Sequence, residues 1–361
     1  MTRTAVNTRV KSIESAGNLT QIKVIGVGGG GSNAVNRMIE EGLPDIEFIS
    51  VNTDAQALVR SIAPTRIRIG DRLTRGLGVG GDHKLGMLAA DESREEVAKV
   101  IHGADLLFIT AGMGGGTGTG AAPVLAEVAR LQGILTIAVV TMPFGFEGSF
   151  RARVAEEGII RLKERADTII AIPNERLLSL CDTNVSIDQA FKMVDSVLLS
   201  SVQGISEVIT TCGHINLDFN DVRATMSEAG YAWIGMGYGE GKTRAADAAR
   251  GATVSPLFEY SIENAKRILF NVVGNDLGLS EVNEAANLIR DVADPTAQII
   301  FGLATDPKLG KKVKITLIAT GFKEHKGLDE GEDIASAGEM GQMGMTAAET
   351  TRRRSFFPWS R

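Results

Sequence analysis

The chain has 361 residues, with 38 Lys and Arg against 44 Asp and Glu, and a formal net charge of −6. This length predicts two domains or one large α/β unit, and the acidic balance argues against nucleic acid as the main partner, because phosphate backbones attract an excess of Lys and Arg. The only cysteines are Cys181 and Cys212, and no apolar run is long enough to span a bilayer or form a signal-peptide core, so we expect a cytoplasmic protein without a direct membrane span.

Residues 1–21 are polar and lack periodicity, so we expect a disordered N-terminal arm. Five near-continuously apolar stretches follow, as is typical of buried parallel strands. They are IKVIGVG at 22, IEFISVNTD at 46, DLLFITAGM at 105, ILTIAVVTM at 134 and TIIAIPN at 168. Helical patterns that end at Gly, such as SNAVNRMIEEG and AAPVLAEVARLQG, separate these stretches. Residues 22–187 are therefore predicted to form an α/β domain with a doubly wound parallel sheet.

Residues 188–212 carry apolar side chains at helical spacing with few breakers, which predicts a central helix about 36 Å long. Residues 213–322 follow a different pattern of strands and helices, which indicates a second, α+β domain with a mixed sheet. Residues 323–351 are rich in Gly, Glu, Met and Ala and are expected to form a flexible linker. The last segment, 352–361, reads RRRSFFPWSR and is expected to be a terminal peptide that binds a partner or a membrane surface.

The first glycine-rich segment, GVGGGGSNAV, follows a predicted strand and opens a predicted helix. Gly26, Gly28 and Gly31 satisfy the G-x-G-x-x-G pattern, and Asp54 stands at the end of the next strand. By themselves these features suit a Rossmann-type dinucleotide oxidoreductase in which an acid binds the ribose.

A second glycine-rich segment, AGMGGGTGTGAAP, also lies between a predicted strand and a helix, whereas a dinucleotide fold needs only one such loop. Gly116, Thr117 and Gly118 at a helix start offer backbone N–H groups, a hydroxyl and the helix dipole to a phosphate. Neither segment contains the Gly-Lys-Ser/Thr of a Walker loop. The two loops together favour a nucleoside triphosphate.

Several segments together closely resemble FtsZ, the bacterial relative of tubulin that polymerises with GTP at the division site. They are IKVIGVGGGGSNAVNRMI, NTDAQAL, GMGGGTGTGAAPV, TMPFGFEG, IPNERLL, VQGISEVIT and NLDFNDVRATM. The similarity extends from about Ile22 to Phe322. It implies a tubulin/FtsZ-like fold, GTP hydrolysis with Mg²⁺, a head-to-tail homopolymer and a place at the mid-cell division site.

The resemblance also implies which residues bind GTP or GDP. The expected phosphate contacts are Gly29, Gly30, Gly31, Ser32 and Asn33 in the first loop, and Gly116, Thr117 and Gly118 in the second. The expected ribose and base contacts are Glu147, Arg151, Asn174, Phe191 and Asp195. A carboxylate such as that of Asp195 can accept from both N1–H and the 2-amino group of guanine, whereas adenine offers no such donor pair. Phe191 lies four residues earlier on the same helical face, where its ring can stack on the base.

One loop departs from the family pattern, because this chain reads GLGVGGDHKLG where FtsZ sequences commonly read close to GLGAGANP. Val79 is bulkier where the family often has Ala near the terminal phosphate, which puts the hydrolysis rate and nucleotide-dependent switching in question while leaving nucleotide binding intact. His83 is expected to be an exposed loop residue, since no Cys or second His stands at metal-ligand spacing. We therefore expect no protein-bound metal centre.

The segment HINLDFNDVR follows the predicted long helix. Its start lies about 25 Å along the helix from Asp195, beyond the reach of a nucleotide held there, unless Gly204 breaks the helix. Carboxylates at the end opposite the nucleotide suggest head-to-tail association into filaments. The resemblance implies that Asn216, Asp218 and Asp221 enter the next subunit's site and polarise the attacking water. Alternatively, NLDFND is a turn whose acids cap the next helix, and one residue can do both.

Arg352, Arg353 and Arg354 precede the aromatic residues of the tail, the reverse of the usual family order. The usual adaptor of the family is therefore not expected to fit. Arginines beside aromatic residues are expected to bind anionic lipid or a division or membrane-anchoring protein, with a plain disordered terminus as the alternative. Two alternatives stay open for the whole chain. One is an FtsZ-like paralogue with a cell-shape or scaffold role and slow hydrolysis, and the other is the dinucleotide oxidoreductase.

Overall fold

The computed structural model describes residues 20–178, 185–211, 213–255 and 262–322. The predicted linker and terminal peptide, and the N-terminal arm up to residue 19, lie outside these residues. Six strands form a parallel sheet in the order β3-β2-β1-β4-β5-β6. They are β1 (Ile22–Val27), β2 (Ile46–Asn52), β3 (Thr65–Arg68), β4 (Leu106–Gly112), β5 (Leu135–Met142) and β6 (Thr168–Pro173). This is the strand order of a doubly wound fold, as predicted.

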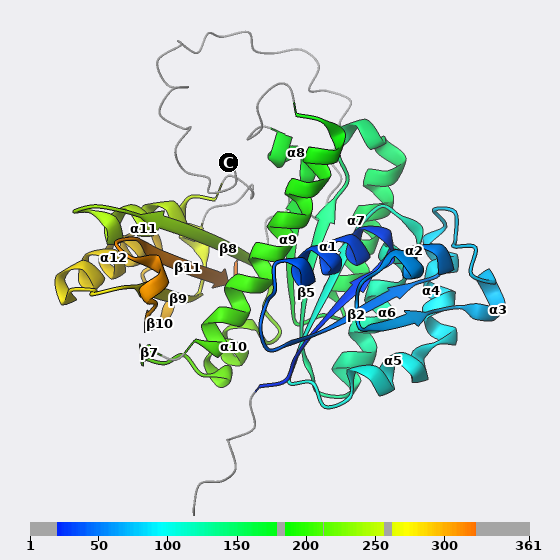
Figure 1. Ribbon diagram of the computed structural model, residues 1–361, viewed down its shortest axis with the longest axis horizontal. Helices are drawn as coiled ribbons and strands as arrows, with labels where there is room; N and C mark the ends of the chain where they lie inside the picture. The colour runs from blue at the N-terminus through cyan, green and yellow to red at the C-terminus, as the bar shows by residue number, and fades with distance from the viewer. Residues whose placement is uncertain (1–19, 179–184, 212, 256–261, 323–361) are drawn as a thin grey trace, which may run out of the picture.

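Helices cover both faces of this sheet, because its strands are apolar on both sides (Figure 1). On one face pack α1 (Gly28–Glu40), α9 (Ile187–Thr210) and α10 (Phe219–Met226). On the other face pack α5 (Arg94–Ile101), α6 (Gly116–Leu131) and α7 (Ser149–Lys163). Shorter helices lie in the connections: α2 (Ala55–Arg60), α3 (Asp71–Thr74), α4 (His83–Glu92) and α8 (Asn174–Leu178).

The predicted central helix is present as α9, which is 24 residues long and begins at the side-chain cap Ser186. It is continuous through Gly204, where an added Cβ would lie 3.2 Å from Cγ2 of Thr316 in the second sheet. Leu198, Val202 and Ile205 of α9 are buried in one apolar core that extends into both sheets. Burial between the two sheets therefore holds this helix in place.

The second sheet is mixed, as predicted, and has the order β8-β11-β9-β10-β7. Its strands are β7 (Gly213–Ile215), β8 (Gly230–Gly239), β9 (Arg267–Gly274), β10 (Gln298–Thr305) and β11 (Val313–Thr320), with helices α11 (Arg244–Thr253) and α12 (Leu279–Val292). The sequence did not indicate that β8 joins the two sheets. Its residues Gly230 and Tyr231 pair with β6, and from Ala232 onward it pairs with β11.

Candidate nucleotide site

The two glycine-rich loops form the first turns of helices. Helix α1 begins at Gly28, several residues before the start that the sequence pattern suggested, and α6 begins at Gly116, inside the loop where the sequence placed a helix start. The reason is close packing on β4. A Cβ on Gly31 would lie 2.3 Å from the Thr110 carbonyl oxygen, and one on Gly118 would lie 2.7 Å from the Gly112 carbonyl oxygen. Packing against the sheet thus outweighs the roughly 1 kcal/mol that each glycine costs inside a helix.

The N-terminal ends of α1 and α6 meet, since a Cβ on Gly28, at φ +73°, would lie 2.9 Å from the Gly118 nitrogen. Neither helix has a side-chain cap or an acidic residue in its first turn. Side chains do cap other helices: Asp54 on α2, Asp82 on α4, Ser186 on α9 and Asp218 on α10. Two adjacent uncapped helix starts present free N–H groups and positive dipole ends, which is the arrangement that binds phosphate.

The predicted phosphate residues differ in accessibility. Gly29, Gly30 and Asn33 are exposed, and no atom lies within 4 Å of a Cβ placed on Gly29. Ser32 is buried, and its hydroxyl is 2.7 Å from the Ser50 hydroxyl. Its side chain therefore belongs to the core, and only its backbone N–H is suited to a phosphate. In the second loop Gly116 and Gly118 are buried and Thr117 is half-buried.

Asp54 does not have the surroundings expected of a ribose-binding acid. Its carboxylate accepts hydrogen bonds from the N–H groups of Gln56 and Ala57, at 2.8 and 3.4 Å, and so caps α2. The dinucleotide interpretation required this carboxylate for the ribose. The structure instead uses it to begin a helix, which weighs against the oxidoreductase alternative.

An aromatic cluster lies beside the predicted base contacts. The ring of Phe191 meets Phe144 edge-on at 5.6 Å, and Phe144 stacks on Phe146 at 5.1 Å. Phe144 is buried, whereas Phe191 and Phe146 are exposed. Asn174, at the start of α8, is buried, and its Oδ1 has no hydrogen-bond partner among the described residues. Because buried acceptors are normally paired, an N–H donor of a bound base fits this oxygen.

Asp195 lies one turn after Phe191 on α9. Burial raises the pKa of its carboxyl group to about 7, and the positive charge of Arg37 on α1 opposes this shift. Such a perturbed carboxyl group is a feature of binding sites. Donors from a guanine base would favour its ionised form, because that form accepts both hydrogen bonds.

Glu147 and Arg151 lie beside the second glycine loop, and Gly114 of that loop would place a Cβ 2.8 Å from the Arg151 carbonyl oxygen. The Glu147 carboxylate accepts from the Phe144 N–H at 3.0 Å and forms an ion pair with Arg151. About half of the Arg151 side chain is exposed. Both residues are therefore near the phosphate cradle, the name we use for the starts of α1 and α6 with their glycine-rich residues 28–33 and 114–118. The Glu147 carboxylate already has two protein partners.

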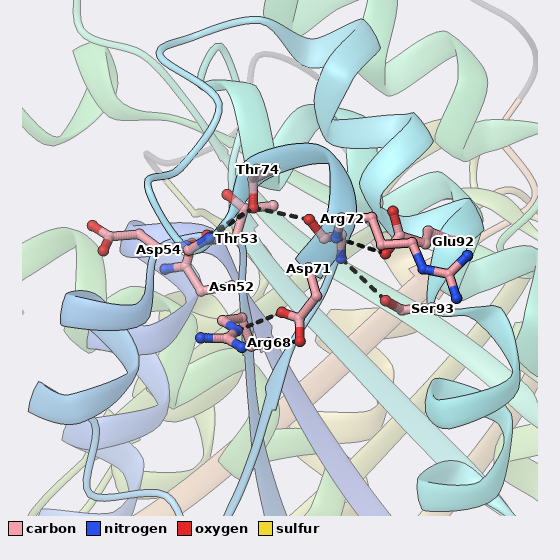
Figure 2. A network of polar contacts seen from close by, with 11 residues as sticks. Asn52, Thr53, Asp54, Arg68, Asp71, Arg72, Thr74, Glu92 and Ser93 are labelled. Carbon is pink, nitrogen blue, oxygen red and sulfur yellow. Dashed lines mark hydrogen bonds and ion pairs between the residues drawn. The ribbon is translucent and has the colours of Figure 1, made fainter.

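Residues 70–82, which include the short helix α3, form a connection that covers the second glycine loop; we call it the cover loop. Its start is fixed by polar contacts, which Figure 2 shows: the Gly70 N–H donates to Ser93, and the Arg72 N–H donates to Glu92. Further along, Val79 is buried over Gly116, where an added Cβ would lie 2.4 Å from its Cγ2. The Val79 side chain thus fits because Gly116, in the phosphate cradle, has no side chain of its own.

The expectation that His83 is an exposed loop residue is wrong. His83 is the first residue of α4, and only 12% of its side chain is exposed. Its carbonyl oxygen packs on Gly120 of α6, where an added Cβ would lie 2.1 Å away. Its Nε2 lies 3.5 Å from the Glu157 carboxylate on α7. Packing of α4 against α6 buries the residue, and this contact between distant segments left no local pattern in the sequence.

We call residues 216–221, which contain Asp218 and Asp221, the acidic loop. It lies at the other end of α9 from Phe191 and Asp195 (Figure 1). Because α9 is unbroken, Asp195 and the end of the helix are separated by about 22 Å. Asn216 and Asp218 are exposed and Asp221 is half-buried. The structure therefore does not bring these residues to the nucleotide cradle of their own chain.

The two acids of this loop also cap α10, as the alternative interpretation expected. Asp218 Oδ1 accepts from the Asp221 N–H, and Asp221 Oδ2 accepts from the Asp218 N–H, both at 3.0 Å. Asn216 accepts from the Gly213 N–H. Each carboxylate uses one oxygen in this reciprocal capping box, which leaves its second oxygen for another partner.

Within the described part of the chain, no helix has both the length and the apolar character that a bilayer crossing requires. Comparison with known families and structures gives a consistent result. Residues 21–182 match the Tubulin/FtsZ family GTPase domain, and residues 230–323 match the FtsZ family C-terminal domain.

Among solved structures, the chain is similar to an empty FtsZ dimer of M. jannaschii, with 44% identity over 84% of this chain and 88% of that chain, at a TM-score of 0.78. CetZ2 of Haloferax volcanii, solved as a GTPγS-bound protofilament, shares the fold at 21% identity over 86% of this chain and 96% of that chain, with a TM-score of 0.73. The family matches, the high-identity relative and the two-loop cradle agree, and the chain belongs to the Tubulin/FtsZ family as an FtsZ-type GTPase.

Proposed function

We propose that this chain is a GTP-dependent cytoskeletal GTPase that forms head-to-tail filaments and hydrolyses GTP where two subunits meet. The observation that carries this proposal is the separation of the cradle and the acidic loop by the length of α9. A contact between one end of a subunit and the opposite end of the next is heterologous and repeats into a filament. The similar M. jannaschii protein was solved as an FtsZ dimer, which agrees with self-association.

The residues of the cradle fit GTP. The uncapped starts of α1 and α6 suit its phosphates, and the unpaired Oδ1 of Asn174 suits a donor of the base. Asp195 and Phe191 lie one turn apart on α9. At this spacing the Asp195 carboxylate can accept hydrogen bonds from guanine while the Phe191 ring stacks on the same base. We expect Glu147 and Arg151 to contact the ribose. When bound with the nucleotide, Mg²⁺ would offset phosphate charge.

In the proposed reaction the acidic loop acts on the nucleotide of the neighbouring subunit. Asp218 and Asp221 each keep one carboxylate oxygen outside the capping box, and these oxygens would orient and polarise the attacking water, together with Asn216. Hydrolysis then depends on assembly, because a subunit alone holds the two parts of the site about 22 Å apart.

The proposal also assigns functions along the chain. Residues 22–187 form the GTP-binding domain, and the central helix in 188–212 connects the domains and contributes Phe191 and Asp195 to the base contacts. Residues 213–322 present the acidic loop. Residues 323–351 act as a linker, and 352–361 bind division or membrane-anchoring proteins, so that filaments assemble at mid-cell. A slowly hydrolysing scaffold or a paralogue that shapes cells is the second candidate, because Val79 covers the cradle where the family often has Ala.

A mixing experiment tests hydrolysis between subunits. The Asp218→Asn variant keeps its cradle, whereas Gly116→Ala places a Cβ 2.4 Å from Val79 and damages the cradle but keeps the acidic loop. Each variant alone should release little phosphate from GTP. An equimolar mixture should recover part of the wild-type rate, because the intact loop of one variant meets the intact cradle of the other.

In the matched control, Asp218→Asn is mixed with the double variant Gly116→Ala/Asp218→Asn in place of Gly116→Ala. This mixture should recover no activity, because neither of its components has an intact acidic loop. If the mixture releases no more phosphate than the sum of its components, the loop does not act on a neighbour. Sedimentation with GTP, measured on the same samples as phosphate release, separates the GTPase from the slowly hydrolysing scaffold, whereas depletion and cell imaging separate it from a paralogue that shapes cells. Wild-type protein that sediments without releasing phosphate would support the scaffold.

A further inference from the structure

Thr53, the residue after β2, connects the second glycine loop to the cover loop. It is fully buried. Its hydroxyl lies 2.7 Å from the Thr117 hydroxyl at the start of α6, and its carbonyl oxygen accepts from the Gly78 N–H at 3.2 Å. The Thr74 hydroxyl is also turned toward this carbonyl, at 3.4 Å, although it is closer to the Gly70 carbonyl oxygen, at 3.0 Å (Figure 2).

The cover loop is attached to this segment along its backbone. The Ala55 N–H donates to the Gly76 carbonyl oxygen at 3.0 Å, and Asp54 and Leu77 form an antiparallel bridge. This pairing leaves the Leu77 side chain 86% exposed. Residues 53–55 therefore hold residues 76–78 through backbone contacts.

The contacts close a ring around the first turn of α6. Val79, next to Gly78, packs over Gly116, and Thr117, next to Gly116, bonds Thr53. The cover loop thus touches the phosphate cradle directly through Val79 and indirectly through Thr53.

The chemistry of the hydroxyl pair makes this route sensitive to a phosphate. A threonine hydroxyl has one proton to donate and can accept two hydrogen bonds, and in the Thr53–Thr117 pair either oxygen can be the donor. If Thr117 donates its proton to a phosphate oxygen at the start of α6, Thr53 has to be the donor within the pair. The phosphate thereby fixes which hydroxyl donates in the Thr53–Thr117 hydrogen bond, whereas without a phosphate either hydroxyl can donate.

We propose that Thr53 is a positioning residue that couples phosphate binding at α6 to the placement of the cover loop. This inference rests on the proposed GTP site. With a nucleotide bound, the chain from phosphate to Thr117 to Thr53 holds Gly78 and, through it, Val79. Without a phosphate the direction of the hydroxyl pair is not fixed, and the backbone bonds of residues 76–78 hold the loop less tightly.

The test uses Thr53→Val, which removes the hydroxyl at nearly constant shape, and Thr53→Ser, which keeps it. Hydrogen exchange of the amides of residues 76–82 is measured in the full chain, with and without a non-hydrolysable GTP analogue. In wild-type protein and Thr53→Ser the analogue should slow exchange about fivefold, the factor typical of one hydrogen bond. In Thr53→Val this slowing should be lost, while the Kd of the analogue stays within about threefold of wild type.

A merely structural role predicts another result: Thr53→Val would speed exchange equally in both states, and the slowing by the analogue would persist. That result overturns the proposal, as does a Thr53→Ser variant that behaves like Thr53→Val. If melting curves show that Thr53→Val does not fold, Thr53→Ala removes the same hydroxyl. Wild-type protein that fails to bind the analogue would contradict the proposed function itself, whereas normal binding with unchanged loop protection in Thr53→Val contradicts only the role of Thr53.

Discussion

Asp218 has a structural role and a proposed chemical role, and two substitutions separate them. Its Oδ1 accepts the Asp221 N–H at 3.0 Å and so begins α10. Asp218→Asn keeps an oxygen that can accept this hydrogen bond but removes the charge, since Asn and Asp cap helices about equally well. Asp218→Ala removes both the cap and the charge. The two variants therefore differ in stability but share the loss of the carboxylate.

The expected magnitudes follow from the geometry. Loss of the cap in Asp218→Ala should lower the free energy of unfolding by about 1 kcal/mol, which corresponds to about 2–4 °C in melting temperature for a domain of 150–250 residues. Asp218→Asn should change it by only a few tenths of a kcal/mol. If the carboxylate polarises water at the neighbour's nucleotide, both variants should lose about 10²–10⁴-fold in turnover. Affinity of the monomer for GTP should not change, because its own cradle is about 22 Å away.

The assays are phosphate release at saturating GTP, thermal melting, and binding of a fluorescent GTP analogue at protein concentrations below assembly. Glu284→Gln, an exposed acid on α12, serves as the control and should match wild type in all three. Wild-type turnover in Asp218→Asn, together with low turnover in Asp218→Ala, would show that the acid only caps α10. Loss of GTP affinity in either variant would refute the separation of the loop from its own cradle.

Three further predictions concern the cradle and the domain junction. Burial raises the pKa of Asp195 to about 7, so GTP affinity should fall as the pH falls through 7 and be about tenfold weaker at pH 6 than at pH 8; an equally steep pH dependence in Asp195→Asn would contradict this. The same raised pKa stabilises the nucleotide-free fold at low pH, and this contribution is lost as the pH rises through 7. Gly116→Ala should abolish GTP binding. Adding Val79→Ala should restore only part of the binding, because the new Cβ would still lie 3.0 Å from the Gly81 carbonyl carbon. Full recovery of affinity in a nucleotide titration would be inconsistent with that backbone contact. The Asp167 carboxylate accepts from the N–H groups of Thr136 and Glu228, at 2.9 and 3.3 Å, so Asp167→Ala should cost about 1–3 kcal/mol in urea unfolding, and an unchanged midpoint would show that these bonds contribute nothing.

The amino-acid sequence by itself predicted the elements that burial defines. Near-continuous apolar stretches predicted β1, β2, β4, β5 and β6 but not the short edge strand β3, and helical spacing of apolar residues predicted α9 close to its observed bounds. These patterns are local, because a residue is buried or exposed according to the face it occupies on its own element. The sequence also predicted that each glycine-rich segment follows a strand and opens a helix, and both do.

Only the tertiary structure decided which groups meet. Asp54 and Asp218 are both acids beside a helix start, yet the sequence pattern cannot show whether such an acid caps its helix, binds a ligand or does both. The pairing of Thr53 with Thr117, 64 positions apart, and the burial of His83 against α6 likewise left no periodic signal. The physical reason is that hydrogen-bond partners and close packing depend on how distant segments are stacked, whereas periodicity reports only that a face is buried.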